Sequence, residues 1–209
     1  SYTKTIQNND TLTISLAGII YEYHPYKLFL NVISDYLEIN SNRKVRIHFY
    51  GISNKKEIYS IIEQRGNLKD SIKIFPKIPN NQLVQELSKS NILLLFNDYS
   101  IMGTKIYDYL ALNRKIILCF ENDEEANLLK KRCFNYKPIK GLSESLQADL
   151  IRKTNSGIIV KDREHLHKVL DDLCHEFEEK GYIENHTVGA EMYSRKVQTE
   201  KLVRKLKSI

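Results

Sequence analysis

The sequence has no tryptophan, only three cysteines and no long apolar run. No stretch approaches the roughly 18 apolar residues of a membrane-spanning helix, and no signal peptide opens the chain. The cysteines Cys119, Cys133 and Cys174 have spacings that match neither a zinc site nor a C-x-x-C motif. An odd number of cysteines without paired spacing favours a reducing, cytoplasmic compartment. These absences argue against a membrane-spanning protein, a disulfide-rich secreted domain and a zinc module.

The net charge of +6 is mild for 209 residues. It fits an anionic partner such as a nucleotide or a lipid headgroup, and it equally fits ordinary surface lysines. Nucleic acid is not an expected partner, because no basic run carries the interleaved aromatics of an RNA-binding sheet. The chain begins with Ser1 rather than Met, so we expect it to be part of a longer protein. We expect residues 1–10 to be a leader or linker and residues 11–209 to form a single domain.

Short apolar runs that stop at glycine or polar residues predict six strands. They cover Leu12–Ala17, residues 44–50, 71–75, 91–96 and 115–120, and Gly157–Val160. Helical spacing predicts helices at residues 24–39, 54–64, 82–88, 143–153, 165–180 and 188–206, and another that starts near Gly103. Residues 121–140 are polar and expected to be irregular. The last helix is basic, with Met192, Leu202, Val203 and Leu206 expected to face inward.

Strict alternation of strand and helix predicts an α/β fold with a doubly wound parallel sheet. In such sheets, ligands bind outside the carboxyl ends of the strands. The residues expected to converge there are Gly18, Gly51, residues 75–78, residues 97–103 and Phe120.

The helix after Gly103 carries the strongest candidate site. Its first N–H groups lack partners within the helix, and the macrodipole adds partial positive charge, so an anion can bind there. Gly103 allows close approach of a ligand, Thr104 can cap the helix or bind a phosphate, and Lys105 adds a full charge. Asp108 lies on the same helix face and can accept ribose hydroxyls. Alternatively, Lys105 and Asp108 form an exposed ion pair of little energetic value.

The order of motifs resembles a known family over most of the chain. The segments are LTISLAGIIYEYHPYKL, VRIHFYG, IKIFPKIPNNQLVQEL, GTKIYDYLALNRKII, LIRKTNSGIIV and the triplet Tyr193-Ser194-Arg195. Together they are similar to the C-terminal, donor-binding half of a GT-B fold glycosyltransferase of the group 1, retaining type. The resemblance implies a Rossmann-like domain that binds a nucleotide-diphosphate sugar, with an N-terminal acceptor domain that this chain does not contain.

The resemblance also implies roles for particular residues. Gly18 and Ile19 would approach the diphosphate, Lys77 and Ile78 the base, and Asp108 the ribose. Lys105 would stabilise the leaving group together with the helix N-terminus, without a metal or another cofactor. The implied process is synthesis of a surface polysaccharide or other glycan, in the cytoplasm and at the inner face of the membrane.

This sequence departs from the family pattern at several positions. Ser100 stands where the common motif has a first glutamate, and Ile19 replaces a frequent arginine. Asn113 and Lys115 replace a glycine and a proline. Two alternatives therefore remain open: a non-catalytic sugar-nucleotide-binding or interaction domain, and half of a sugar-nucleotide epimerase.

Other candidates have simpler interpretations. His165 and His167 lie two positions apart on a helix, so we expect solvated or half-buried side chains rather than a zinc pair. His24 is expected to cap or pack at a helix start. The tyrosines of residues 21–26 could line a sugar pocket, although packing is the preferred interpretation. The basic last helix could face anionic lipid, the missing domain or solvent.

Overall fold

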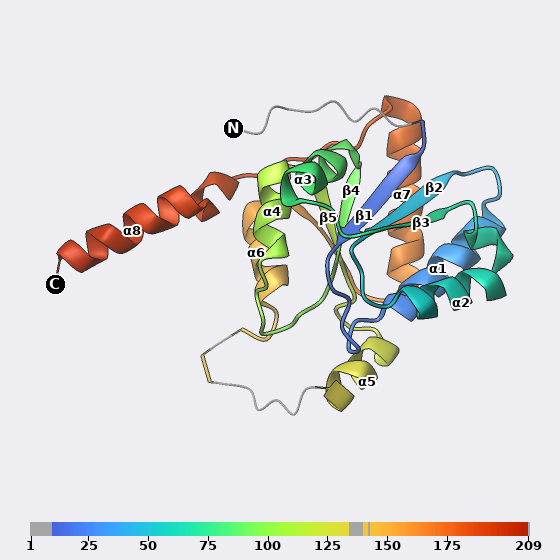
Figure 1. Cartoon of the computed structure of the whole chain (residues 1–209), viewed down its shortest axis with the longest axis horizontal. Coiled ribbons are helices and arrows are strands. Elements are labelled where there is room, and N and C mark those ends of the chain that lie inside the picture. Colours follow the sequence, from blue (N-terminus) through green and yellow to red (C-terminus); the bar gives the residue numbers. More distant parts are fainter. Residues whose placement is uncertain (1–9, 134–139, 142, 209) are drawn as a thin grey trace.

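The computed structural model describes residues 10–133, 140–141 and 143–208. Its strands form a six-stranded sheet with the order β3-β2-β1-β4-β5-β6, and all neighbours are parallel (Figure 1). The strands are β1 (Leu12–Ala17), β2 (Val45–Tyr50), β3 (Ile72–Phe75), β4 (Ile92–Phe96), β5 (Lys115–Cys119) and β6 (Gly157–Val160). The predicted doubly wound parallel sheet is confirmed. The leader expected at residues 1–10 lies, apart from Asp10, outside the described residues.

Helices cover both faces of the sheet (Figure 1). One face packs against α1 (Tyr26–Ile39), α2 (Lys55–Gln64) and α7 (Arg163–Lys180), and the other against α3 (Asn80–Lys89), α4 (Lys105–Leu112) and α6 (Leu146–Thr154). The central strands β1 and β4 are buried along their whole length, as expected for strands covered on both sides. α3 begins at Asn80 rather than at the expected Gln82, a difference of two residues.

The sheet divides between β1 and β4, where the strand order reverses. β1 pairs with β2 along all six of its residues but with β4 at only Ile14 and Ser15. Further along β1, the backbone N–H of Ala17 donates to the hydroxyl of Tyr109 on α4, at 3.0 Å. The two central strands therefore separate toward their carboxyl ends, and α4 borders the opening. This is the topological switch point at which α/β sheets bind ligands.

Residues 121–140 are not irregular throughout, which corrects the expectation. A helix, α5 (Glu124–Cys133), lies beyond the carboxyl ends of the strands (Figure 1). Asp123 caps the N-terminus of this helix, because its carboxylate accepts hydrogen bonds from the N–H groups of Glu125 and Ala126. Residues 134–139 of the same segment lie outside the described part.

The expected last helix is wrong in two respects. It divides at Ser194 into a short 3-10 turn, η2 (Ala190–Tyr193), and α8 (Arg195–Lys207). The four apolar residues expected to face inward are between 42% and 62% exposed: Met192, Leu202, Val203 and Leu206. Figure 1 shows α8 projecting away from the sheet. Apolar spacing indicates which residues share a helix face, but it does not supply a partner for that face. Among the described helices, none is long and apolar enough to cross a membrane.

Candidate functional site

α4 begins at the switch point with its first turn free of side-chain capping. Gly103 adopts a left-handed backbone with φ +65°, which turns the chain from the loop after β4 into the helix. Thr104 occupies the N-cap position, but its side chain makes no capping hydrogen bond, contrary to one of its two expected roles. The unpaired N–H groups of the first turn therefore keep their capacity to bind an anion.

Lys105 reaches across the opening from α4 to the loop after β1. Its Nζ donates to the carbonyl oxygen of Ile19 at 2.9 Å, so it does not form the alternative ion pair with Asp108. Gly18, with φ +86°, makes room for this lysine, because a Cβ at that position would lie 2.9 Å from Lys105 Cε. Burial lowers the pKa of Lys105, and the carboxylate of Asp98 acts in the opposite direction. A cation thus lies in the gap between β1 and α4, beside a glycine backbone.

Two adjoining cavities occupy this opening, and together we call them the switch-point crevice. The larger, about 400 Å³, is lined by Gly18, Ile19, Tyr50, Gly51, Lys77, Ile78, Pro79, Asn80 and Leu83. The smaller, about 130 Å³, is lined by Ala17, Gly18, Asn80, Leu83, Val84, Leu87, Lys105, Asp108, Tyr109 and Leu112. The structure therefore brings together six of the eight residues proposed from the sequence: Gly18, Ile19, Lys77, Ile78, Lys105 and Asp108. Gly103 and Thr104 precede α4 and line neither cavity.

The crevice carries two basic side chains, Lys77 and Lys105, and one acidic side chain, Asp108. Lys105 faces the loop after β1, whereas Asp108 lies one turn further along α4 in the smaller cavity. Desolvation raises the pKa of Asp108, and the positive charge of Arg195 opposes that effect. The larger cavity also borders Gly51, which has a left-handed backbone and where an added Cβ would lie 3.3 Å from the Cα of Lys77. A ligand that is anionic at one end and rich in hydroxyl groups at the other fits this distribution of charge.

Asp98 belongs to residues 97–103, which were expected at this edge, but the sequence analysis gave it no role of its own. It follows β4 directly, and its carboxylate accepts hydrogen bonds from Tyr23 at 2.9 Å, His24 at 2.8 Å and Gln147 at 3.1 Å. Gln147 also donates to the carbonyl oxygen of Met102. These bonds fasten the loop after β1 to the loop after β4. The signal was present, since an acidic residue directly after a buried apolar strand falls at the ligand-binding edge.

His24 packs at the start of α1, as expected. Its hydrogen bonds fix the imidazole ring in one tautomer. Its Nδ1 accepts from the backbone N–H of Tyr21 at 3.1 Å, so the ring proton resides on Nε2 and is donated to Asp98. The side chain is only 4% exposed, and this burial lowers its pKa. His24 is therefore a neutral donor that positions Asp98 and the Tyr21 backbone.

His165 and His167 of α7 are half-buried, as expected. His165 accepts a hydrogen bond from the backbone of Lys161, and the ring of His167 lies 6.0 Å from that of Tyr36. Across residues 10–133, 140–141 and 143–208, no group of three or more His, Cys, Asp or Glu side chains is arranged to hold a metal ion. The metal independence expected of the reaction stays a prediction.

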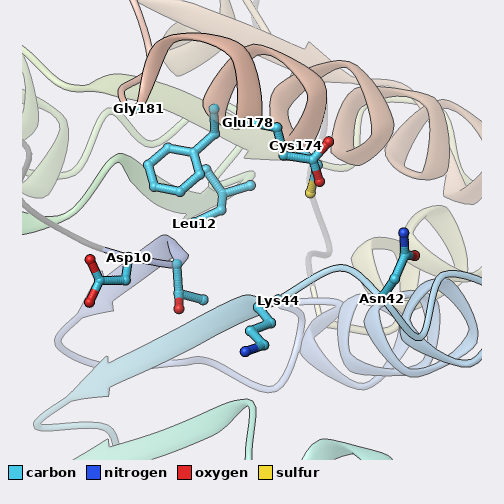
Figure 2. A pocket seen from close by; sticks show the side chains of 9 residues that line it. Asp10, Leu12, Asn42, Lys44, Cys174, Glu178 and Gly181 are labelled. Atoms are coloured by element: carbon cyan, nitrogen blue, oxygen red, sulfur yellow. The ribbon is translucent and has the colours of Figure 1, made fainter.

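A separate cavity of about 380 Å³ lies at the opposite end of the sheet, between the start of β1 and α7 (Figure 2). Its lining mixes acidic Asp10 and Glu178 with basic Lys44 and the thiol of Cys174. Burial raises the pKa of that thiol, which disfavours the nucleophilic thiolate. Nothing in this lining converges on one chemistry, so the switch-point crevice remains the candidate site.

The chain matches no protein-family model and no curated protein sequence. Its structure is similar to HepE of Anabaena in complex with UDP, with a TM-score of 0.59, 10% identity and coverage of 96% of this chain and 50% of that one. A point mutant of S. aureus TarM, in complex with fondaparinux, alpha-GlcNAc-glycerol and UDP, gives a TM-score of 0.55 at 15% identity over 93% and 35% of the two chains. This is the fold of a C-terminal GT-B glycosyltransferase domain.

The same fold occurs in an enzyme of a different class. UDP-GlcNAc 2-epimerase of Methanocaldococcus jannaschii, in complex with UDP-GlcNAc and UDP, has a TM-score of 0.53 at 12% identity over 95% of this chain and 46% of that one. The chain thus spans about a third to a half of the length of these three structures. At such low identity the likeness establishes the GT-B fold, including the expected Rossmann-like sheet.

Proposed function

We propose that this chain binds the nucleoside diphosphate of a sugar nucleotide in the switch-point crevice, as the donor domain of a glycosyltransferase. The observation that carries the proposal is the placement of Lys105, between the uncapped start of α4 and the backbone of Gly18 and Ile19. This arrangement places a full positive charge and unpaired N–H groups at one point. Structures of the same fold that contain UDP support the proposal.

The proposed orientation follows from the charge distribution of the crevice. The diphosphate lies against Lys105 and extends beyond the two cavities to the start of α4, where Gly103 lets it approach the backbone and Thr104 offers a hydroxyl. The ribose hydroxyls donate to Asp108, and the base enters the larger cavity beside Lys77 and Ile78. As the glycosidic bond breaks, negative charge develops on the departing diphosphate, and Lys105 and the helix N-terminus stabilise it. No step in this scheme requires a metal ion.

The wider setting forms part of the same proposal. The acceptor is held by another domain of a longer protein, so this chain alone binds the donor and transfers no sugar. The product is a surface polysaccharide or related glycan made in the cytoplasm. We also propose that α8 rests on an anionic membrane surface, because it carries six basic residues, one acidic residue and three exposed apolar side chains.

Nucleotide binding tests the proposal directly. Isothermal titration with UDP, GDP, ADP and CMP should show binding of at least one nucleoside diphosphate, with equal affinity in EDTA and in Mg²⁺. Lys105→Met should weaken that binding by roughly 10- to 100-fold, because it removes a charge-assisted contact with phosphate. Lys27→Met is the matched control, since Lys27 is exposed on α1 and its loss changes the net charge equally. If the panel gives no binding, or if Lys27→Met weakens it as much, the donor-site proposal fails.

The alternatives give different results in the same experiments. A non-catalytic interaction domain that has lost the donor site binds no nucleotide. An epimerase half binds UDP but would need acid and base groups on the sugar side. Asp108→Asn tests the proposed orientation of the nucleotide, in which the ribose lies beside Asp108. It should weaken UDP binding by several-fold and leave the binding of inorganic pyrophosphate unchanged. Equal loss for both ligands would place the diphosphate, rather than the ribose, beside Asp108.

A further inference from the structure

A pocket of about 470 Å³ lies directly beside the switch-point crevice, and the proposed binding of the nucleotide does not use it. We call it the tyrosine pocket, and it is lined by Ile19, Ile20, Tyr21, Glu22, Tyr23, Ser53, Asn54 and Cys133. Ile19 lines this pocket and the larger cavity of the crevice, so the two spaces are neighbours at the carboxyl ends of the strands. Whatever occupies the tyrosine pocket therefore lies close to the diphosphate site.

One wall of the pocket is an aromatic pair that the fold holds in place. The rings of Tyr21 and Tyr23 stack with centroids 5.4 Å apart and an interplanar angle of 6°. Tyr23 is fixed by its hydrogen bond to Asp98 and by edge contact with His24, whose ring lies 4.6 Å away. The backbone of Tyr21 donates to His24. The hydrogen bonds around Asp98 thus preorganise this wall, which lowers the entropic cost of binding a ligand.

Tyr21 packs against its neighbours, as expected of this cluster, on only part of its ring. Tyr26 is buried, but Tyr21 is 46% exposed although one of its ring faces stacks on Tyr23. Its other face is therefore the one available to a ligand. Around it stand polar groups of several kinds: the exposed carboxylate of Glu22, the exposed hydroxyl of Ser53 and the side chain of Asn54. A flat apolar surface ringed by donors and acceptors suits a ligand with apolar C–H faces and hydroxyl edges.

We infer that the tyrosine pocket is a carbohydrate subsite, in which a pyranose ring stacks on Tyr21 and its hydroxyls bond to the surrounding polar groups. The inference deepens the proposed function, because the subsite lies one residue, Ile19, away from the proposed diphosphate. The sugar bound there belongs either to the donor or to a glycan acceptor. Both sources share the same chemistry, and separate arms of one experiment distinguish them.

The donor arm compares UDP with UDP-glucose, UDP-galactose and UDP-N-acetylglucosamine by isothermal titration. The acceptor arm measures saturation-transfer NMR signals of free maltose, lactose and N,N′-diacetylchitobiose. Wild type is compared with Tyr21→Ala, Tyr21→Phe and Tyr182→Ala. Tyr182 is the matched control, because it is also 46% exposed but lies just after α7, at the other end of the sheet. Melting temperatures of all variants establish that they are folded.

Tyr21→Ala should weaken carbohydrate binding by roughly ten-fold, whereas Tyr21→Phe and Tyr182→Ala should change it by less than about two-fold. Affinity for UDP itself should stay unchanged in all three variants. If wild type binds a UDP-sugar more tightly than UDP and Tyr21→Ala does not, the subsite holds the donor sugar. A disaccharide signal that disappears in that variant assigns it to the acceptor.

The inference is overturned if no sugar in either arm binds, or if Tyr21→Ala and Tyr182→Ala behave alike. Its failure is distinct from failure of the proposed function. If UDP binds but no sugar contributes to binding in either arm, only the carbohydrate-subsite inference fails. Disaccharide binding without any nucleotide binding removes the donor-site proposal and keeps the subsite.

Discussion

One hydrogen bond of Tyr109 joins α4 to the end of β1 at the crevice. Its hydroxyl oxygen accepts from the N–H of Ala17 at the point where β1 no longer pairs with β4, and its side chain is only 1% exposed. Tyr109→Phe leaves that buried N–H without its partner. An unsatisfied buried backbone group costs about 1–3 kcal/mol, so the free energy of unfolding should fall by about that amount.

Urea denaturation measures this loss, and the same helix provides the control. Tyr107 is 36% exposed on α4, so Tyr107→Phe should change the free energy of unfolding by less than about 0.5 kcal/mol. Similar losses in the two variants would mean that the hydroxyl of Tyr109 does not support the end of β1.

Single residues also show where prediction from sequence succeeds. Gly18, Lys105 and Asp108 could be placed in one crevice because each follows a strand or starts a helix at the carboxyl edge of the sheet. Asp98 lies at the same edge, but its partners Tyr23 and Gln147 are 75 and 49 residues away in the chain. Hydrogen bonds between distant loops depend on tertiary geometry, which no local pattern records.

Among the helices, α5 and α8 show opposite errors of prediction from sequence. α5 was missed because it has little apolar periodicity, yet other signals mark it. Glu124 and Glu125 occupy its first turn, and three basic residues, Lys130, Lys131 and Arg132, occupy its last. This distribution complements the helix macrodipole. α8 was found from its apolar spacing, but no side chain in it is buried.

The exposure of α8 leads to a prediction about the element alone. Removing residues 195–209 should shift the melting temperature by less than about 2 °C, because α8 has no buried residue to lose. The same truncation should abolish co-sedimentation with phosphatidylglycerol vesicles. Each basic residue near an anionic surface contributes about 1 kcal/mol, so binding should also weaken as salt is raised.

Two variants of the untruncated chain separate the contribution of charge from that of apolar insertion. One replaces Lys201, Arg204 and Lys205 with glutamine, and the other replaces Leu202 and Leu206 with serine. Both should reduce vesicle binding, and neutral phosphatidylcholine vesicles should bind weakly throughout. A large fall in melting temperature on truncation, or equal binding to neutral and anionic vesicles, would contradict the membrane role of α8.

For the whole molecule, the doubly wound parallel sheet was the most predictable property and the geometry between loops the least. Alternating strands and helices with right-handed crossovers leave few arrangements, so the doubly wound sheet follows from the sequence. Burial of individual polar side chains does not follow from it. His24 precedes a helix and His48 lies within a strand, yet the fold withdraws the ring of His24 from water almost completely and that of His48 in part. That withdrawal makes global stability depend on pH.

Both histidines have lowered pKa values in the folded chain. Burial lowers the pKa of His24, with Asp98 opposing and Lys105 adding to the effect. Burial and the charges of Lys73 and Arg46 lower the pKa of His48 from 6.5 to about 4, against the opposing charge of Glu86. Below about pH 6.5 the unfolded chain therefore binds more protons than the folded one. The stabilising contribution is complete above that pH and is lost as the pH falls toward the folded-state values.

Between about pH 7.5 and about pH 5.5, the free energy of unfolding should fall, because both histidines take up a proton more readily in the unfolded chain. For His48, which solvent partly screens, the decrease should be less than about 1 kcal/mol. Urea denaturation at both pH values measures the decrease. His24→Gln and His48→Gln should each reduce the pH dependence, because each removes one group that takes up a proton only on unfolding. His175→Gln is the control, since that side chain is 67% exposed on α7. If His175→Gln reduces the pH dependence of the free energy of unfolding as much as the other two variants do, that dependence arises from surface charge and not from His24 and His48.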